Sequence, residues 1–262
     1  MKLRNLLGAA LLLFACAAPV EASAQFNIGK GISAVAKGVQ AMTLSDEQMA
    51  AYVKQSVDWM DKNNPVLPED NEYTKRLRRL TVNCKEADGI PLNFKVYDVV
   101  DINAFACPDG SVRVFTGLMD IMTDDELMGV VGHEIGHVLK HHSKKALKQQ
   151  LLTDAALDAA GSVSSTVSTL SDSALGGLAK NLMSAKYSQK QESEADDCGY
   201  DFLVANGLNP WGMAMAFEKL SSGETGKQST ISKMFSSHPD TKKRIEKMSK
   251  RAQKDGYTKP AN

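Results

Sequence analysis

The chain has 262 residues, of which 43% are hydrophobic and 24% are charged. These fractions are close to the average of soluble globular domains and argue against a largely disordered chain or a multi-span membrane protein. Lysine and arginine together number 31, as do aspartate and glutamate, so the net charge is zero. This balance lacks the strongly basic character of nucleic-acid-binding proteins, and we expect no nucleic-acid partner.

Residues 1–24 have the pattern of a secretory signal peptide. Two basic residues precede an apolar stretch that is too short for an ordinary membrane span. Cleavage after Ala24 fits the rule of small residues before the cleavage site and predicts a soluble exported protein. The alternative is a lipoprotein signal, because residues 13–16 resemble a lipobox in which Cys16 would become the lipidated N-terminus.

No repeat or flexible linker divides residues 25–262, which predicts one α+β domain in which helices dominate. The segment 151–186 carries little charge and is expected to be helix plus mobile loop. In chain order the sequence predicts a helix at 44–62, an amphipathic helix after Pro68, a strand at 92–99, a hairpin of 103–107 with 111–116, a helix that opens with a capping box at 123–126, and later helices beginning near Ser188, at 209–210 and after 238–239.

Three cysteines follow the expected signal peptide, and no two of them form a C-x-x-C pair. A zinc site made of cysteines is therefore not expected. Cys84 and Cys107 could form a disulfide in an oxidising compartment, or all three could remain buried thiols.

The strongest chemical signal is the sequence H-E-x-x-H at residues 133–137. On a helix, His133 and His137 lie about 40° apart around the axis and about 6 Å apart along it, so both imidazoles can bind one metal ion. Apolar residues occupy the opposite side of this helix. The helix can therefore bury one face while it presents the two histidines to a cleft.

The same helix carries two further features. His141 and His142 are expected to be structural, with His142 on the apolar side and His141, a full turn beyond the motif, able to line the cleft. Gly129, Gly132 and Gly136 form a strip beside the two candidate ligands. Another element could approach the helix closely along this strip, because glycine has no side chain.

A catalytic zinc ion needs a third protein ligand and a position for water. The motif is not extended to a third histidine, because Lys140 and Ser143 stand at the positions that this extension requires. The alternative is a carboxylate on another helix. Glu192 lies on the inward face of a later helix, whereas Glu194 faces water. Asp196, one turn after Glu192, is placed to orient a ligand or to pair with an arginine.

Several further motifs follow one another in a specific order and spacing. They are Asn103-Ala104-Phe105-Ala106, Gly110, Thr116-Gly117-Leu118, H-E-x-x-H at 133–137, Glu192-x-x-x-Asp196 and Ser237-His238-Pro239. With these motifs the sequence resembles the M48 family of zinc metallopeptidases over most of residues 25–262. Within the family it is most similar to the small periplasmic members of LoiP/YggG type.

The resemblance implies a helix-rich zincin-like fold with a small antiparallel sheet, and zinc-dependent endopeptidase activity with one Zn²⁺ per chain. It implies zinc ligation by His133, His137 and Glu192, with Glu134 as general base. His238 would stabilise the oxyanion or, in a resting state, occupy the open zinc position. Arg244 would pair with Asp196.

The resemblance also implies a periplasmic protein that acts on polypeptides. If the strand Asn103, Ala104, Phe105 and Ala106 borders the cleft, it could pair with an extended substrate by adding a strand to the sheet. We therefore expect unfolded, damaged or misassembled envelope proteins as substrates, with association to the outer membrane if Cys16 is lipidated. The alternative is a latent protease that acts mainly as a chaperone or assembly adaptor.

Overall fold

The computed structural model describes residues 46–153, 170–222, 238 and 241–261. The expected signal peptide and the start of the helix expected at 44–62 lie outside these residues, as does most of the loop expected within 151–186. The helices are α2 (Asp46–Asn63), α3 (Glu72–Leu80), α4 (Thr116–Met119), α5 (Asp124–Leu139), α6 (His142–Thr153), α7 (Asp172–Met183), α8 (Gln189–Ala205), α9 (Trp211–Ser222) and α11 (Thr241–Lys254). The strands are β1 (Glu86–Ala87), β2 (Ile90–Pro91), β3 (Asn93–Tyr97), β4 (Ala104–Ala106) and β5 (Ser111–Phe115).

The central sheet has the strand order β3-β5-β4. Strands β4 and β5 form the expected antiparallel hairpin, with Phe105 opposite Arg113. Strand β3 is parallel to β5, so the sheet is mixed rather than antiparallel throughout. The physical reason is the connection after β3. It leads to β4 on the far side of β5, and the chain then turns back into β5, which therefore runs in the same direction as β3. A separate antiparallel pair joins β1 to β2.

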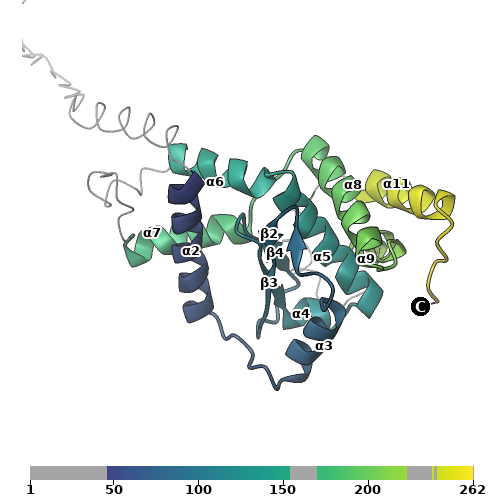
Figure 1. The fold of residues 1–262 in the computed structure, drawn as a ribbon, viewed down its shortest axis with the longest axis horizontal. Coiled ribbons are helices and arrows are strands. Elements are labelled where there is room, and N and C mark those ends of the chain that lie inside the picture. The colour runs from purple at the N-terminus through teal and green to yellow at the C-terminus, as the bar shows by residue number, and fades with distance from the viewer. Residues whose placement is uncertain (1–45, 154–169, 223–237, 239–240, 262) are drawn as a thin grey trace, which may run out of the picture.

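Helices cover both faces of this sheet (Figure 1). Successive side chains of a strand point to opposite faces. Phe105 of β4 therefore packs in a cluster with α2 and α7, whereas Ala104 and Ala106 pack in the larger cluster that contains α5, α8 and α9. The helix with the H-E-x-x-H motif thus lies between the sheet and the C-terminal helices.

An ion pair between buried Arg113 and partly buried Asp61 links α2 to the sheet. Arg113 of β5 is 1% exposed and donates hydrogen bonds to the Asp61 carboxylate from Nε, at 2.8 Å, and from Nη2, at 3.0 Å. Lys95 and Tyr97 of β3 donate to the same carboxylate. Burial alone would raise the pKa of Asp61, but these hydrogen bonds lower it, so the carboxylate stays ionised.

Helix α5 begins where its sequence predicts. The Thr123 side chain accepts a hydrogen bond from the Glu126 N–H, and the Glu126 carboxylate accepts one from the Thr123 N–H, which completes the capping box. Lys219 of α9 pairs with the same carboxylate. The capping box therefore fixes the start of α5 and also links this helix to α9.

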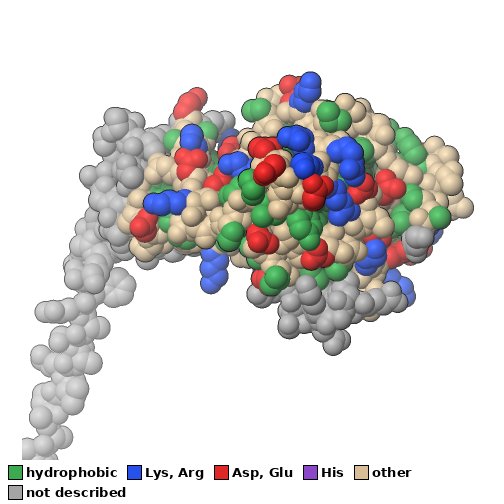
Figure 2. Space-filling view, turned by 90° about the horizontal axis from the view of Figure 1, so that it is seen from below, with side chains coloured by type: hydrophobic (Ala, Val, Ile, Leu, Met, Phe, Trp, Pro, Cys, Tyr) green, Lys and Arg blue, Asp and Glu red, His purple; other side chains and the backbone are tan. Residues whose placement is uncertain are grey.

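The surface carries charges of both signs side by side. On the face in Figure 2, lysine and arginine side chains lie among aspartate and glutamate side chains. Ion pairs such as Lys247–Asp197 and Arg251–Asp201 link α11 to α8. The three cysteines Cys84, Cys107 and Cys198 are free thiols. Of the helices in the described ranges, none is long and apolar enough to cross a membrane.

The glycine strip of α5 is where α8 and α9 approach most closely. A Cβ added at Gly136 would lie 2.1 Å from the backbone oxygen of Ala195 in α8, and one added at Gly129 would lie 2.3 Å from the backbone of Gly212 in α9. Real Cβ atoms cannot approach other atoms so closely. The expectation that other elements pack against this strip is therefore confirmed.

Gly136→Ala is expected to destabilise the protein, because its Cβ would collide with backbone rather than with a flexible side chain. We expect the free energy of unfolding to fall by about 1–3 kcal/mol in urea denaturation. Gly177→Ala in α7 is the matched control, because a Cβ there meets nothing within 4 Å. The control should raise stability by up to about 1 kcal/mol. An unchanged unfolding midpoint for Gly136→Ala would contradict the close contact.

Candidate metal centre

The H-E-x-x-H motif places two imidazoles side by side inside the protein. His133 and His137 are each 1% exposed, and their Nε2 atoms lie 3.2 Å apart. Burial lowers the pKa of His137 well below its usual value, so this ring is neutral. A neutral imidazole is the form that binds metal.

Helix α8 brings a carboxylate to this pair. Ser188 caps the helix, as predicted, and Glu192 in its first turn is fully buried. The Glu192 oxygens lie 3.5 Å from Nε2 of His133 and 3.5 Å from Nε2 of His137. Burial alone would raise the pKa of Glu192, but hydrogen bonds with His137 and His238 lower it, so the group is a carboxylate anion.

His238, which precedes α11, joins the same cluster. Its Nδ1 lies 3.1 Å from Nε2 of His133 and 2.9 Å from Oε1 of Glu192. His133, His137, Glu192 and His238 each offer one ligand atom, and these four atoms all lie within 4.8 Å of one another. The structure therefore brings together every residue that the sequence suggested for the metal or its open position.

Glu134 lies beside the cluster, and one of its oxygens has no hydrogen-bond partner among the described residues. The side chain is buried, Oε1 makes no hydrogen bond within the described part of the chain, and this oxygen lies 3.6 Å from Nε2 of His238. Burial raises the pKa of Glu134. A buried polar atom without a partner is costly, and such atoms are found where a ligand or water binds.

The four ligand atoms fit a tetrahedral zinc ion. Ligands about 2.0–2.1 Å from such an ion lie roughly 3.3 Å from one another. The shortest separations here, between ring nitrogens and between nitrogen and carboxylate oxygen, run from 2.9 to 3.5 Å. Imidazole nitrogen and carboxylate oxygen are also ligand types that zinc accepts.

Asp196 and Arg244 contact residues of the cluster and each other. Oδ1 of Asp196 lies 2.9 Å from Nδ1 of His133, and Arg244 donates to Asp196 from Nε and Nη2 at 2.8 and 2.7 Å. Arg244 also lies 2.6 Å from Glu192. Burial opposes ionisation of Asp196, but these hydrogen bonds lower its pKa to about 2. Asp196 thus contacts both a candidate ligand and the arginine, the two contacts that its position on α8 predicts.

The structure corrects the interpretation of His142. His142 does not point to an apolar side, because α5 ends at Leu139 and His141 adopts a φ of 55° that redirects the chain. His142 is buried with its Nδ1 3.1 Å from Nδ1 of His137, and its Nε2 lies 3.1 Å from Glu194. Glu194 is 40% exposed and therefore faces water, as expected, but it also contacts His142.

Tyr187 is a neighbour that the sequence did not reveal. Its ring stacks on His137 with centroids 3.8 Å apart and an interplanar angle of 25°. The residue lies in the segment between α7 and α8, where no periodic pattern indicates which way a side chain points. A signal for His142 did exist, because histidine is one of the few residues that tolerate a positive φ and could therefore end α5 at 141.

Strand β4 lies at the edge of the sheet, next to α5. Ala104, Phe105 and Ala106 are buried, and the Asn103 side chain donates to the backbone oxygen of Met183 at 3.4 Å. An edge strand has backbone groups that no strand of its own sheet pairs. Strand β4 therefore lies at a sheet edge, which is the position that pairing with an extended substrate would require.

Residues 71–252 match the profile described as Peptidase family M48. The chain belongs to this family. It is 40% identical to the metalloprotease LoiP of Escherichia coli K12 over 249 residues, which cover 94% of this chain and 98% of LoiP. It is also 38% identical to the metalloprotease YcaL of the same organism over 238 residues, 90% of this chain and 91% of YcaL. The mitochondrial metalloendopeptidase OMA1 of Arabidopsis thaliana is 26% identical over 85% of this chain and 44% of that protein.

Membership in the M48 family makes the chain a metallopeptidase with a zincin-like, helix-rich fold. The similarity to LoiP along nearly the full length of both proteins confirms the predicted resemblance to LoiP-type members. The cluster of His133, His137, Glu192 and His238 lies inside the matched residues. Among the residues that the structure describes, this cluster is the place that fits the metal of an M48 protein.

We expect His142→Ala to weaken metal binding by about 10- to 100-fold, because it removes the side chain that holds the second nitrogen of His137. Competition with a chromophoric zinc chelator measures the affinity. His141→Gly is the control, because His141 is exposed and glycine accepts its positive φ. Equal zinc affinity in His142→Ala and wild type would show that the contact does not support the ligand.

Proposed function

We propose that this M48 protein is a zinc-dependent endopeptidase that hydrolyses peptide bonds in unfolded, damaged or misassembled proteins of the cell envelope. The observation that carries the proposal is the buried Glu134, whose Oε1 has no hydrogen-bond partner in the described part of the chain and lies beside four ligand-type atoms. A structural zinc site has four protein ligands and needs no base beside it. Glu134 therefore favours a catalytic site over a structural one.

Each side chain of the cluster has a defined task in this proposal. His133, His137 and Glu192 would hold the metal, while Asp196 fixes the ring of His133. Zinc, when bound, lowers the pKa of a water molecule and polarises the carbonyl of the scissile bond. Glu134 accepts the proton of the attacking water at Oε1 and passes it to the leaving amine. Its buried position, which raises its pKa, suits a group that must hold a proton between these two transfers.

The substrate class follows from what the site offers to a peptide. Edge strand β4 can pair with an extended chain through backbone hydrogen bonds, a mode that reads backbone more than side chains. Unfolded segments present an extended backbone of this kind, whereas most backbone groups of a folded protein are already paired. The neutral protein also exerts no strong electrostatic steering that would favour substrates of one charge.

Location in the envelope is proposed from the N-terminal sequence. Residues 1–24 have the pattern of an export signal, and Cys16 would anchor the protein to the outer membrane if the lipoprotein signal is used. The mass of the mature N-terminus distinguishes the two forms. If the protein isolated from cells still contains residues 1–24, both forms are contradicted.

Glu134→Gln is expected to keep the metal and lose cleavage, because glutamine has the shape of glutamate but accepts no proton. The rate of cleavage of an unfolded protein such as reduced casein should fall by at least about 10²-fold. Zinc content, measured by mass spectrometry on the purified protein, should stay at one ion per chain. Undiminished cleavage by a zinc-loaded Glu134→Gln protein would contradict the assignment of Glu134 as the general base.

A latent protease that acts mainly as a chaperone is the second candidate, and the position of His238 favours it. Nδ1 of His238 lies where it can fill the fourth ligand position and exclude the attacking water. If the ring holds the site closed, His238→Ala raises the cleavage rate of a zinc-loaded protein. If the ring stabilises the oxyanion instead, the same substitution lowers kcat by about 10²–10³-fold.

A further inference from the structure

A series of side-chain contacts leads from the metal-binding cluster to the surface of α8. Nδ1 of His137 lies 3.1 Å from Nδ1 of His142, and Nε2 of His142 lies 3.1 Å from Oε2 of Glu194. His137 and His142 are each 1% exposed, whereas the Glu194 side chain is 40% exposed. The series therefore begins at a buried candidate ligand and ends at a carboxylate that reaches water.

Only one arrangement of protons allows these contacts together with a metal ion on Nε2 of His137. An imidazole nitrogen binds metal through its lone pair, so the proton of a neutral His137 must be on Nδ1. Two nitrogens 3.1 Å apart share a single proton, and Nδ1 of His142 must therefore accept it. The proton of His142 is then on Nε2, where the Glu194 carboxylate accepts it.

The opposite tautomer of His142 would oppose metal binding. With a proton on its Nδ1, His142 would donate to Nδ1 of His137, and the His137 proton would then be on Nε2, the atom that faces the cluster. That nitrogen would have no lone pair for the ion. An ionised carboxylate accepts hydrogen bonds but cannot donate one. Glu194 therefore selects the tautomer of His142 that leaves a lone pair on Nε2 of His137.

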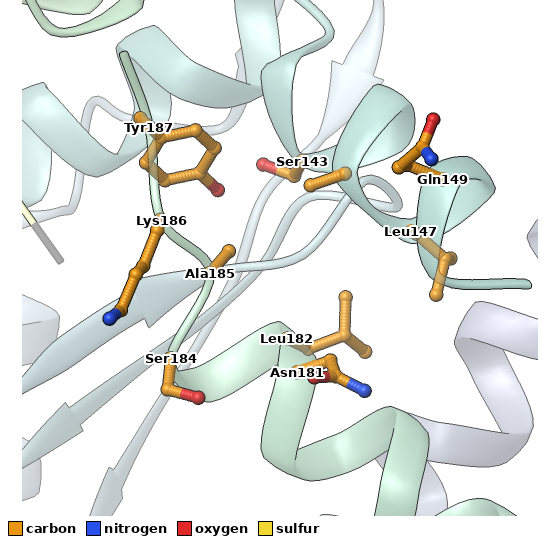
Figure 3. A pocket seen from close by; sticks show the side chains of 10 residues that line it. Ser143, Leu147, Gln149, Asn181, Leu182, Ser184, Ala185, Lys186 and Tyr187 are labelled. Atoms are coloured by element: carbon orange, nitrogen blue, oxygen red, sulfur yellow. The ribbon is translucent and has the colours of Figure 1, made fainter. Parts of the chain in front are cut away.

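Tyr187 shields the contact between the two histidines. The residue lines a pocket between α6, the end of α7 and residues 184–187, and its ring points towards Ser143, which directly follows His142 (Figure 3). The Tyr187 ring stacks on His137 with centroids 3.8 Å apart, and its centroid lies 6.1 Å from that of His142. The two imidazoles thus meet in a buried place, where a hydrogen bond is stronger than in water.

Both histidine ligands are supported by carboxylates of the same helix, α8. Asp196 contacts Nδ1 of His133 directly, at 2.9 Å. Glu194 comes two residues earlier in the sequence, and at about 100° per residue it lies on a different side of the helix. It reaches His137 only through the intervening ring of His142. The partner carboxylate of a metal-binding histidine is a common arrangement, and here one of the two contacts is lengthened by a second histidine.

We propose that Glu194 is a positioning residue of the metal centre: through His142 it fixes the tautomer and the orientation of His137, so that Nε2 of His137 is available to the metal ion. This inference rests on the proposed zinc-dependent function and gives a half-exposed residue of α8 a part in holding the metal. Because Glu194 acts through His142, its effect should appear in metal affinity.

Glu194→Gln and Glu194→Met are the decisive pair of variants. Both remove the charge and keep the length of the side chain, but glutamine keeps an oxygen that accepts a hydrogen bond, whereas methionine has only a weakly accepting sulfur. Zinc affinity, measured by competition with a chromophoric chelator, should fall by about tenfold in Glu194→Met. In Glu194→Gln it should fall by about threefold at most, since a neutral acceptor bonds more weakly than a carboxylate. Equal losses in the two variants would overturn the proposal.

Asp201→Asn is the matched control. Asp201 is an exposed carboxylate about two turns further along the same face of α8, where it pairs with Arg251. This variant should keep the wild-type affinity for zinc, although it loses the same charge as the Glu194 variants.

A double variant tests the path through His142. In a His142→Ala protein, the added change Glu194→Met should lower zinc affinity no further, because two residues that act through one contact are not additive. A second loss as large as in the wild-type background would show that Glu194 acts without His142, and it would overturn the proposal.

The proton on His142 can also be observed directly. Nitrogen NMR spectra of the imidazole rings, recorded on isotope-labelled, zinc-loaded wild-type protein, show which ring nitrogen carries a proton. The loss of a signal in His142→Ala identifies the ring. We expect His142 to carry its proton on Nε2 and to have a bare Nδ1. A proton on Nδ1 would overturn the proposal without the use of any Glu194 variant.

Zinc binding is measured without cleavage, so this inference and the peptidase function can fail separately. If the variants show the expected order of zinc affinities but wild-type protein cleaves no unfolded protein, the peptidase function alone is contradicted. If wild-type protein cleaves reduced casein while Glu194→Gln and Glu194→Met both bind zinc as tightly as wild type, the role of Glu194 alone is overturned.

Discussion

The metal-binding cluster depends on how closely α5 and α8 pack. A carboxylate side chain is short, so Glu192 on α8 reaches both histidines of α5 only if the two helix backbones nearly touch. Glycines make this possible: a Cβ at Gly136 would lie 2.1 Å from the Ala195 oxygen, and one at Gly199 would lie 2.4 Å from the Gly132 oxygen. The glycines around the motif are therefore as important for the ligand geometry as the ligands themselves.

Charge balance explains why a divalent cation suits this interior. Glu134, Glu192 and Asp196 carry three negative charges when ionised, and Arg244 carries one positive charge, so with neutral histidines the sum is −2. Uncompensated charge in a buried site is strongly unfavourable. A divalent ion would neutralise this net charge of −2. Without Arg244, which contacts Asp196 and Glu192, the net charge would be −3. Without the ion, the raised pKa of Glu134 relieves part of the same repulsion.

The parts of the site that lie on uninterrupted helices could be predicted from the sequence, because the helical period fixes which residues share a face. His133, His137, Glu192 and Asp196 belong to this class. The parallel pairing of β3, the contact of His142 with His137 and the stacking of Tyr187 could not be predicted. Each depends on the path of the chain after a helix or strand ends. That path is set by a loop between strands or by a single residue with a positive φ, and neither follows from a periodic pattern.

The two roles considered for His238 do not exclude each other. Among the four candidate ligands it is the most exposed, at 13%, while the other three are nearly or fully buried. It also lies outside the helices that carry those three. It is therefore the one side chain of the cluster that can leave the fourth position without opening the packed contact of α5 with α8. A ring that moves away to admit water remains beside Glu134, 3.6 Å from its Oε1 in the present arrangement, and can then face the oxygen on which negative charge develops.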